Sequence, residues 1–100
     1  MNKLFYSLRL IPSRPDFAFT MTDDEKEIMG EHVAYWTELM NRGKVYAFGP
    51  VMDPKGPYGL GIVAVDSEEE VKEIMAKDPA GRINNYECLQ MMAVVPELKG

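Results

Sequence analysis

The sequence predicts an α+β domain, and three observations lead to that prediction. Two segments with helical periodicity each begin with the spacing of a capping box, Thr22 with Glu25 and Ser67 with Glu70. Four apolar segments accompany them, in the order β, α, β, β, α, β. The chain has 100 residues, of which 46% are hydrophobic and 27% charged, which suits one globular domain over residues 1–100. The order is that of the ferredoxin-like fold, in which two helices cover one face of a four-stranded antiparallel sheet.

The first half of the chain is expected to form a strand and a long helix. Residues 3–11, KLFYSLRLI, have the apolar density of a strand, and residues 12–15, with two prolines, end it as a loop. A helix is expected over residues 22–43. Its first turn is acidic, which suits the positive end of the helix dipole, and Gly43 is placed for a left-handed C-terminal cap.

The second half is expected to form a hairpin, a helix and a last strand. Residues 44–52, KVYAFGPVM, and residues 58–66, YGLGIVAVD, are predicted strands. The segment DPKGP at 53–57 joins them as a turn, because it holds two prolines and a glycine. The second helix follows, and Pro79 stops it. Residues 86–95, YECLQMMAVV, complete the sheet.

Both faces of the predicted sheet are apolar. A half-solvated antiparallel strand alternates apolar with polar side chains, whereas segments 44–52 and 58–66 are apolar on both sides. Two helices cannot cover both faces of the sheet. We therefore expect a second copy of the chain, or another protein, to pack against the uncovered face. The alternative is a monomer in which loops cover part of it.

The composition argues against several classes of function. The net charge is -5, and 11 Lys and Arg residues against 16 Asp and Glu form no basic block, so nucleic-acid binding is not expected. No apolar run approaches the roughly 18 residues of a membrane span, and the first residues lack a signal-peptide cleavage site. The one cysteine, Cys88, cannot form an internal disulfide, so the cytoplasm is the expected compartment. One histidine without cysteine pairs predicts no metal site, and no nucleotide-binding loop is present, so no cofactor is expected.

The single histidine lies on the apolar side of the first helix. A buried imidazole needs a hydrogen-bond partner, which can be a backbone carbonyl, a tyrosine hydroxyl or a carboxylate. Asp78 is one candidate partner for His32, since an acid at a helix C-terminus meets the negative end of the dipole and is unfavourable there on its own. Asp53, in the predicted turn at 53–57, is a second candidate partner. An ordinary core histidine, and an aspartate that only stops the helix, are the structural alternatives.

A pair of His32 and Asp78 would form an acid/base dyad. The carboxylate would fix the tautomer of the ring, and the other nitrogen would take a proton from a bound small molecule. We expect backbone N–H groups near Gly49, and the hydroxyl of Tyr35 or Tyr58, to hold a developing negative charge. No serine or cysteine lies in a nucleophile motif, so no covalent step is expected.

These residues together resemble the YCII-related family. The segments that carry the resemblance are EHVAYWTEL around His32, FGPVMD at 48–53, YGLGIVAV at 58–65, an S-x-E-E helix start and KDP at 77–79. The resemblance covers roughly residues 3–95. It implies ferredoxin-like subunits assembled as a dimeric α/β barrel, which here would be a homodimer through the sheet face. It also implies a cleft in which His32 and Asp78 form the active site, and we expect Gly49, Pro50 and Asp53 to lie beside the substrate.

The resemblance also bears on activity. Lyase-type elimination from small ring compounds is among the activities of the wider family, so it implies a lyase- or isomerase-like enzyme without a cofactor. The alternative is a non-catalytic domain, one that binds a small metabolite or serves as a dimeric accessory module with a structural histidine. The loop of residues 12–21 departs from the family pattern because RPDFAFT adds aromatic bulk, which leaves the size of the substrate open.

Overall fold

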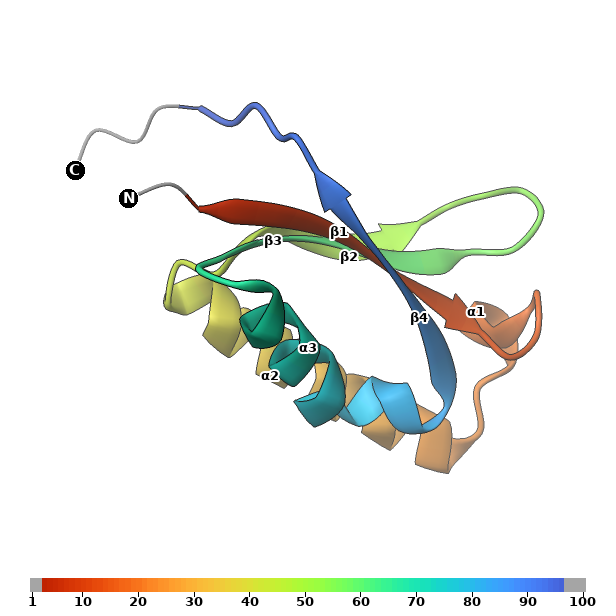
Figure 1. The fold of residues 1–100 in the computed structure, drawn as a ribbon. Helices are drawn as coiled ribbons and strands as arrows, with labels where there is room; N and C mark the ends of the chain where they lie inside the picture. Colours follow the sequence, from red (N-terminus) through yellow and green to blue (C-terminus); the bar gives the residue numbers. More distant parts are fainter. Residues whose placement is uncertain (1–2, 97–100) are drawn as a thin grey trace.

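The computed structural model describes residues 3–96 and contains one antiparallel sheet of four strands. The strands are β1 (Leu4–Pro12), β2 (Val45–Val51), β3 (Tyr58–Val65) and β4 (Asn84–Met91). Their order across the sheet is β2-β3-β1-β4, so β1 lies in the middle and pairs with both β3 and β4 (Figure 1). The fold is ferredoxin-like, as the sequence predicts.

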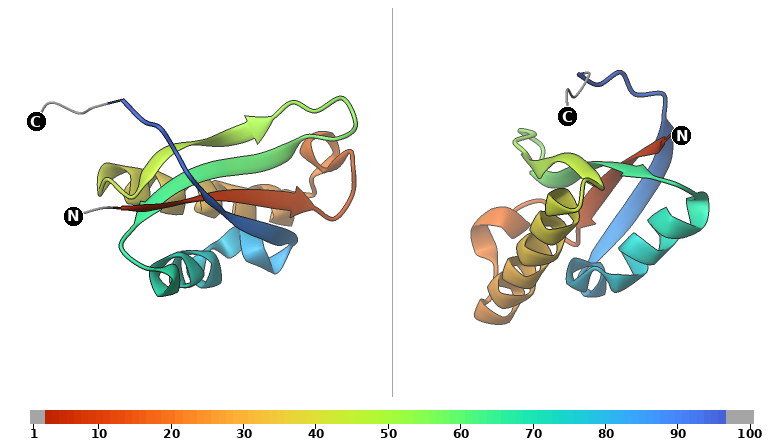
Figure 2. Two further views of the ribbon diagram at one scale, coloured as in Figure 1. Left: turned by 45° about the horizontal axis from the view of Figure 1, so that its top comes forward. Right: turned by 90° about the vertical axis from the view of Figure 1, so that its left-hand side faces the viewer.

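Two helices, α2 (Asp23–Asn41) and α3 (Glu68–Lys77), lie side by side on one face of this sheet (Figures 1 and 2). Two short helical turns, α1 (Phe17–Thr20) and the 3-10 turn η1 (Pro79–Arg82), precede α2 and β4. None of the helices within residues 3–96 has the length and the hydrophobicity to cross a membrane.

The two long helices begin at the predicted capping residues. The Thr22 hydroxyl accepts a hydrogen bond from the Glu25 amide at 3.1 Å, and the Glu25 carboxylate accepts one from the Thr22 amide at 2.8 Å. The Ser67 hydroxyl accepts from the amide of Glu70 at 3.2 Å. Gly43 follows α2 with a φ of 79°, the left-handed conformation that favours glycine. Local chemistry therefore sets where both helices begin and where α2 ends.

The predicted boundaries were wrong at three places. Pro12 belongs to β1, where it pairs with Asn84, and it does not begin the loop. The last strand spans Asn84–Met91 and not residues 86–95. It stops at Met91 because Met91 pairs with Phe5, and β1 itself begins only one residue before Phe5. The predicted loop 12–21 contains α1, whose four residues are too few to show helical periodicity.

Helices pack against one face of the sheet and leave the other face open. Tyr6, Leu8 and Val63 point toward the helices and are buried. On the opposite face, no helix among the described residues covers the sheet (Figure 2). There Leu89 and Met91 are 59% and 40% exposed, respectively. The open apolar face that the sequence predicts is thus present.

Candidate functional site

The structure brings His32 and Asp78 into direct contact. Nδ1 of His32, on α2, lies 2.9 Å from each carboxylate oxygen of Asp78, at the end of α3. The side chains are 12% and 0% exposed, respectively. Asp53, the other candidate partner, lies in the β2–β3 turn, where its carboxylate accepts a hydrogen bond from the Lys55 amide at 2.9 Å.

Asp78 also occupies a structural position. It ends α3 and begins η1, where its side chain accepts a hydrogen bond from the amide of Ala80 at 2.9 Å. The indole Nε1 of Trp36 donates to the same carboxylate at 2.7 Å, and the hydroxyl of Tyr86 on β4 donates to it as well. Asp78 is therefore both the helix stop and the partner of His32, two roles that the sequence presented as alternatives.

The surroundings of Asp78 determine its charge. Burial raises the pKa of this carboxyl group, but hydrogen bonds from His32, Tyr86 and Trp36 outweigh that effect, and the pKa lies below its ordinary value. Burial, together with the hydrogen bond to the carboxylate, raises the pKa of Tyr86, so its hydroxyl keeps its proton. Because a carboxylate only accepts hydrogen bonds, Nδ1 of His32 carries a proton, and in the neutral ring Nε2 carries the lone pair.

Nε2 of His32 is available to a bound molecule. No residue in the described range 3–96 forms a hydrogen bond with it, and it is not one of the buried, unpaired polar atoms of that range. His32 lines a cavity of about 280 Å³ between α2, α1 and the sheet. This volume is near the low end of the roughly 300–1,000 Å³ of ligand pockets. The arrangement therefore leaves a neutral imidazole nitrogen, able to accept a proton, in a cavity that suits a small molecule.

Trp36 forms one wall of the cavity and depends on a glycine of β3. Its side chain is 2% exposed and packs against Phe48, with ring centroids 5.7 Å apart. A Cβ atom at Gly61 would lie 2.3 Å from Cζ3 of Trp36, so only glycine leaves room for the indole here. Gly61 thus allows the indole to reach Asp78.

The other predicted site residues fall into two groups. Gly49 and Pro50 line the cavity, as does Tyr58. The Tyr58 ring, however, lies 4.3 Å from the guanidinium carbon of Arg9, and Arg9 alternates with the buried, helix-facing residues of β1. The ring of Tyr58 is therefore on the open face of the sheet, away from His32.

Two predicted residues lie outside the cavity. The Tyr35 hydroxyl donates to the backbone carbonyl of Ile74 on α3 at 3.0 Å, which ties α2 to α3. Burial raises the pKa of Tyr35, and the nearby Asp78 charge adds to that effect. Asp53 is part of the β2–β3 turn and does not line the cavity. The structure assigns no contact with a cavity ligand to Tyr35 or Asp53.

Sequence reasoning missed the residues of β4 that complete the site. Asn84 and Tyr86 both line the cavity. The Asn84 amide nitrogen donates to the Ala80 carbonyl at 3.0 Å, which leaves its carbonyl oxygen without a partner among residues 3–96. The signal was alternation: Asn84, Tyr86 and Cys88 occupy every second position and face the helices. The alternation was hidden at Asn84 because the strand was predicted to begin only at residue 86.

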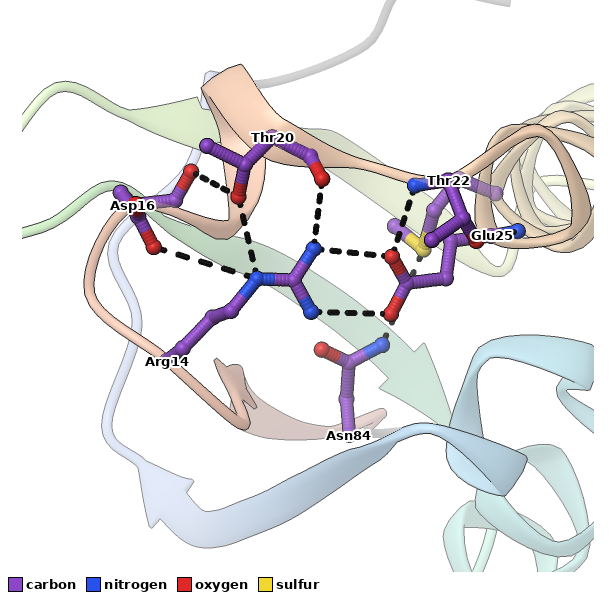
Figure 3. Close-up of polar contacts among 7 residues, drawn as sticks. Arg14, Asp16, Thr20, Thr22, Glu25 and Asn84 are labelled. Atoms are coloured by element: carbon purple, nitrogen blue, oxygen red, sulfur yellow. Dashed lines mark hydrogen bonds and ion pairs between the residues drawn. The ribbon is translucent and has the colours of Figure 1, made fainter.

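The segment before α2 supplies the remaining wall. Figure 3 shows Arg14 extending from this segment to Glu25 on α2, where two guanidinium nitrogens donate to the carboxylate at 3.0 and 2.8 Å. Arg14 also donates to the backbone carbonyl and the hydroxyl of Thr20. The guanidinium carbon lies 5.1 Å from the ring centroid of Phe17, which lines the cavity. The hydrogen bonds from Arg14 lower the pKa of Glu25 to about 2.

Metal ligands do not gather in the part of the chain that the structure describes. No group of three or more histidine, cysteine, aspartate or glutamate side chains forms an arrangement there that could hold a metal ion. The chemistry that this site supports is proton transfer, with one ring nitrogen oriented by a carboxylate and the other available to a ligand.

Solved structures share the fold. The chain is similar to a variant of SnoaB, a cofactor-independent oxygenase from Streptomyces nogalater, with a TM-score of 0.51 and 10% identity over 97% of this chain and 100% of the other. It is also similar to a protein of unknown function from Nitrosomonas europaea, with a TM-score of 0.50 and 14% identity over 99% and 98% of the two chains. At these identities the likeness concerns the fold alone.

Sequence comparison adds the family. None of the curated proteins compared with the chain matches it. A family model, described as the YCII-related domain, matches residues 6–94. The match covers both helices, all but the first two residues of β1 and every other strand, and it includes His32 and Asp78. The chain therefore belongs to the YCII-related family.

Proposed function

We propose that this protein is a small enzyme that moves a proton on a small organic molecule, with His32 as the general base and Asp78 as its orienting partner. One observation carries the proposal: Nδ1 of His32 lies 2.9 Å from both oxygens of Asp78, while Nε2 has no partner among residues 3–96. This arrangement holds the ring in one tautomer and one orientation. A lyase- or isomerase-like reaction needs such a base and no cofactor.

The surroundings of the dyad favour proton transfer to a ligand. The cavity is largely apolar, so little water competes for Nε2 when a molecule is bound. The Asp78 carboxylate would stabilise the imidazolium that forms when Nε2 takes a proton, as a fixed, buried charge at hydrogen-bond distance. A single positioned base contributes about 10²–10⁴-fold to a rate. Backbone N–H groups near Gly49, which lines the cavity, are the donors we propose for the developing negative charge.

The alternative, a binding or accessory domain with a structural histidine, also has an observation in its favour. Asp78 accepts hydrogen bonds from Trp36, Tyr86 and Ala80 in addition to His32. A carboxylate with this many donors joins α2, η1 and β4 whether or not the histidine takes part in a reaction. The two functions differ in one respect: only the enzyme needs an available lone pair on Nε2.

We also propose that the protein works as a homodimer whose subunits meet through the open face of the sheet. Leu89 and Met91 are exposed there, and the rings of Phe5 and Tyr46 pack edge to face beside them at 5.5 Å. Nε of Arg9 on the same face is buried and lacks a partner among residues 3–96. A second copy would remove this apolar surface from water.

The single cysteine, Cys88, favours the reducing cytoplasm as the compartment.

Hydrogen exchange on a small ring compound tests the proposed chemistry without knowledge of the natural substrate. Naphthoresorcinol, an uncharged two-ring compound, exchanges ring hydrogens with heavy water in two steps. A base removes a hydroxyl proton while a deuteron adds to the ring carbon, and the original proton then leaves that carbon as the aromatic ring and the hydroxyl re-form. We expect the protein to accelerate this exchange, measured as loss of proton NMR signal, and His32→Gln to reduce it to the rate in buffer. Tyr35→Phe, on the same helix but outside the cavity, is the matched control. Equal rates for the wild type and His32→Gln, with both folded, would exclude the enzymatic function.

A further inference from the structure

The cavity is lined without any formally charged side chain. Within the described residues 3–96, no Lys, Arg, Asp or Glu lines it. Asp78 lies behind His32 with its side chain fully buried, and its charge is already compensated by four donors. A ligand carboxylate or phosphate in this cavity would lose its hydration without gaining a cationic partner, which is unfavourable. The lining therefore favours an uncharged ligand.

The side-chain polar atoms that remain available in the cavity are hydrogen-bond acceptors. With Nδ1 directed at Asp78, Nε2 is the nitrogen that carries the lone pair in the neutral ring of His32. The amide nitrogen of Asn84 already donates to the carbonyl of Ala80 and to the sulfur of Met29, so its carbonyl oxygen is the part of the amide that a ligand can use. The hydroxyl of Tyr86 donates to Asp78. A ligand satisfies the acceptors of the cavity by donating hydrogen bonds to them, so it should carry hydroxyl groups.

One aromatic side chain limits the size of the cavity. Phe17 is 4% exposed and lines the cavity, whereas Phe19 on the same helical turn is 73% exposed. The guanidinium of Arg14 lies against the Phe17 ring and is fixed in turn by two hydrogen bonds to Glu25 (Figure 3). Pro15 packs closely against the β2–β3 turn, where a Cβ atom at Gly56 would lie 2.8 Å from the carbonyl oxygen of Pro15. The segment is thus held by α2 and by the hairpin, and Phe17 is a rigid wall.

We infer that the site takes a small, uncharged, hydroxyl-bearing molecule, and that Phe17 sets the upper limit of its size. This inference rests on the proposed function for the role of His32. It adds the chemical class of the substrate and names a specificity-determining residue on α1. The sequence left the effect of the segment 12–21 on substrate size open. Four residues of this segment line the cavity, namely Pro12, Phe17, Ala18 and Met21, and Phe17 is the aromatic one to which we assign the effect.

Binding of matched probes tests the ligand class. The probes share a two-ring skeleton: β-naphthol has a hydroxyl donor, β-naphthyl methyl ether lacks the donor, and β-naphthoate carries a negative charge. Binding is followed by NMR through the indole N–H signal of Trp36, the single tryptophan of the chain, which lines the cavity. We expect β-naphthol to bind roughly tenfold or more tightly than either of the other two. Binding of β-naphthoate as tight as that of β-naphthol, or no binding of β-naphthol, would overturn the assigned class.

A second comparison tests Phe17. Phenanthrol adds a third ring to the same hydroxyl-bearing skeleton, and we expect the wild type to bind it weakly. Phe17→Ala should improve its binding roughly tenfold or more, with Phe19→Ala as the matched control that changes nothing. Phe17→Leu keeps more of the packing and should give a smaller gain in the same direction if the alanine variant does not fold. An unchanged preference for two rings in a folded Phe17 variant would refute the size limit.

The outcomes separate this inference from the proposed function. Selective binding of β-naphthol without any acceleration of hydrogen exchange would leave the ligand class standing and remove the enzymatic role. Exchange that depends on His32, combined with equal binding of all probes, would support the enzyme and overturn the ligand class. The two experiments use the same protein and different readouts.

Discussion

The carboxylate of Asp78 meets the imidazole of His32 symmetrically, with Nδ1 at 2.9 Å from each of its oxygens, although 46 residues separate the two in the chain. The same carboxylate accepts hydrogen bonds from an indole, a phenol and a backbone amide. Stability and the proposed chemistry therefore converge on one aspartate, and its substitution should affect both.

Asp78→Asn should lower stability and hydrogen exchange together. The amide keeps the shape of the carboxylate but loses its charge and places an N–H group among donors, so at least one hydrogen bond is lost. We expect the free energy of unfolding in urea to fall by about 1–3 kcal/mol. Asp53→Asn is the control, because Asp53 lies in the β2–β3 turn away from the cavity and accepts only the Lys55 amide. Equal stability of the two variants would contradict the central role of Asp78.

The cost of Asp78→Asn should depend on pH. The pKa of Asp78 is lower in the folded protein than its ordinary value of 3.8, because the hydrogen bonds from His32, Tyr86 and Trp36 outweigh burial. A lowered pKa means that the ionised carboxylate stabilises the fold above pH 3.8 and that this contribution is lost as the pH falls through the folded pKa. We expect the difference in unfolding free energy between wild type and variant to be largest near neutral pH and to shrink in strong acid. A difference in unfolding free energy that grows as the pH falls would contradict the lowered pKa of Asp78.

Gly61→Ala should disturb the site through Trp36. The added Cβ would lie 2.3 Å from the indole, which is buried and cannot move without losing its hydrogen bond to Asp78. We expect a loss of about 1–3 kcal/mol in unfolding free energy and a shifted Trp36 fluorescence maximum. Gly49→Ala on the neighbouring strand is the control, since a Cβ there meets nothing within 4 Å. A Gly61→Ala protein as stable as the control would indicate that the indole can be accommodated elsewhere.

Glu25→Gln should loosen the segment that carries Phe17. The substitution removes the charge that pairs with Arg14 while keeping the length of the side chain. We expect faster amide hydrogen exchange at α1 with little change in the sheet, measured by mass spectrometry. The pKa of Glu25 is about 2, so in the wild type the ion pair should persist through mildly acidic pH and weaken only as the pH falls from about 4.5 toward that value. Protection of α1 that is the same in both proteins would show that Arg14 does not hold it.

Leu89→Glu should separate the proposed homodimer. Leu89 is 59% exposed on the open face of the sheet, and a glutamate there would place a charge in the subunit interface. We expect sedimentation velocity to show a dimer for the wild type and a monomer for the variant. Phe19→Glu is the control, because Phe19 is exposed on α1, outside that face. A wild-type monomer at all concentrations would refute the dimer.

The helices and the dyad could be read from short-range patterns. Capping residues and a glycine in the left-handed region act within one turn of the chain, so Thr22, Ser67 and Gly43 indicated where α2 and α3 begin and where α2 ends. Asp78 stood out because an acid at a helix C-terminus is unfavourable unless a donor meets it. His32 stood out because a buried imidazole needs a partner. These two requirements made Asp78 one of two candidate carboxylate partners for His32, with Asp53 as the other.

The remaining residues of the site could not be inferred in this way. Asn84 reaches the cavity because β4 begins two residues earlier than its apolar pattern indicates, and Tyr86 reaches it because it lies on the same face of that strand. The Tyr58 ring lies on the open face because Leu60, two residues further along β3, is in register with Arg9, which places Tyr58 and Arg9 on the same face. Shifting a strand by one residue reverses the face of every side chain, and register depends on the partner strand.

The sequence by itself determined the order of the elements, the start of each long helix, the apolar character of both sheet faces and the pair of groups able to share a proton. Only the tertiary structure decided that Trp36, Tyr86 and Ala80 also meet Asp78 and that Phe17 closes the cavity. The physical reason is the range of the interactions. Capping and periodicity act over a few residues, whereas Trp36 and Asp78 are 42 residues apart, and their contact exists only when helices and sheet pack together.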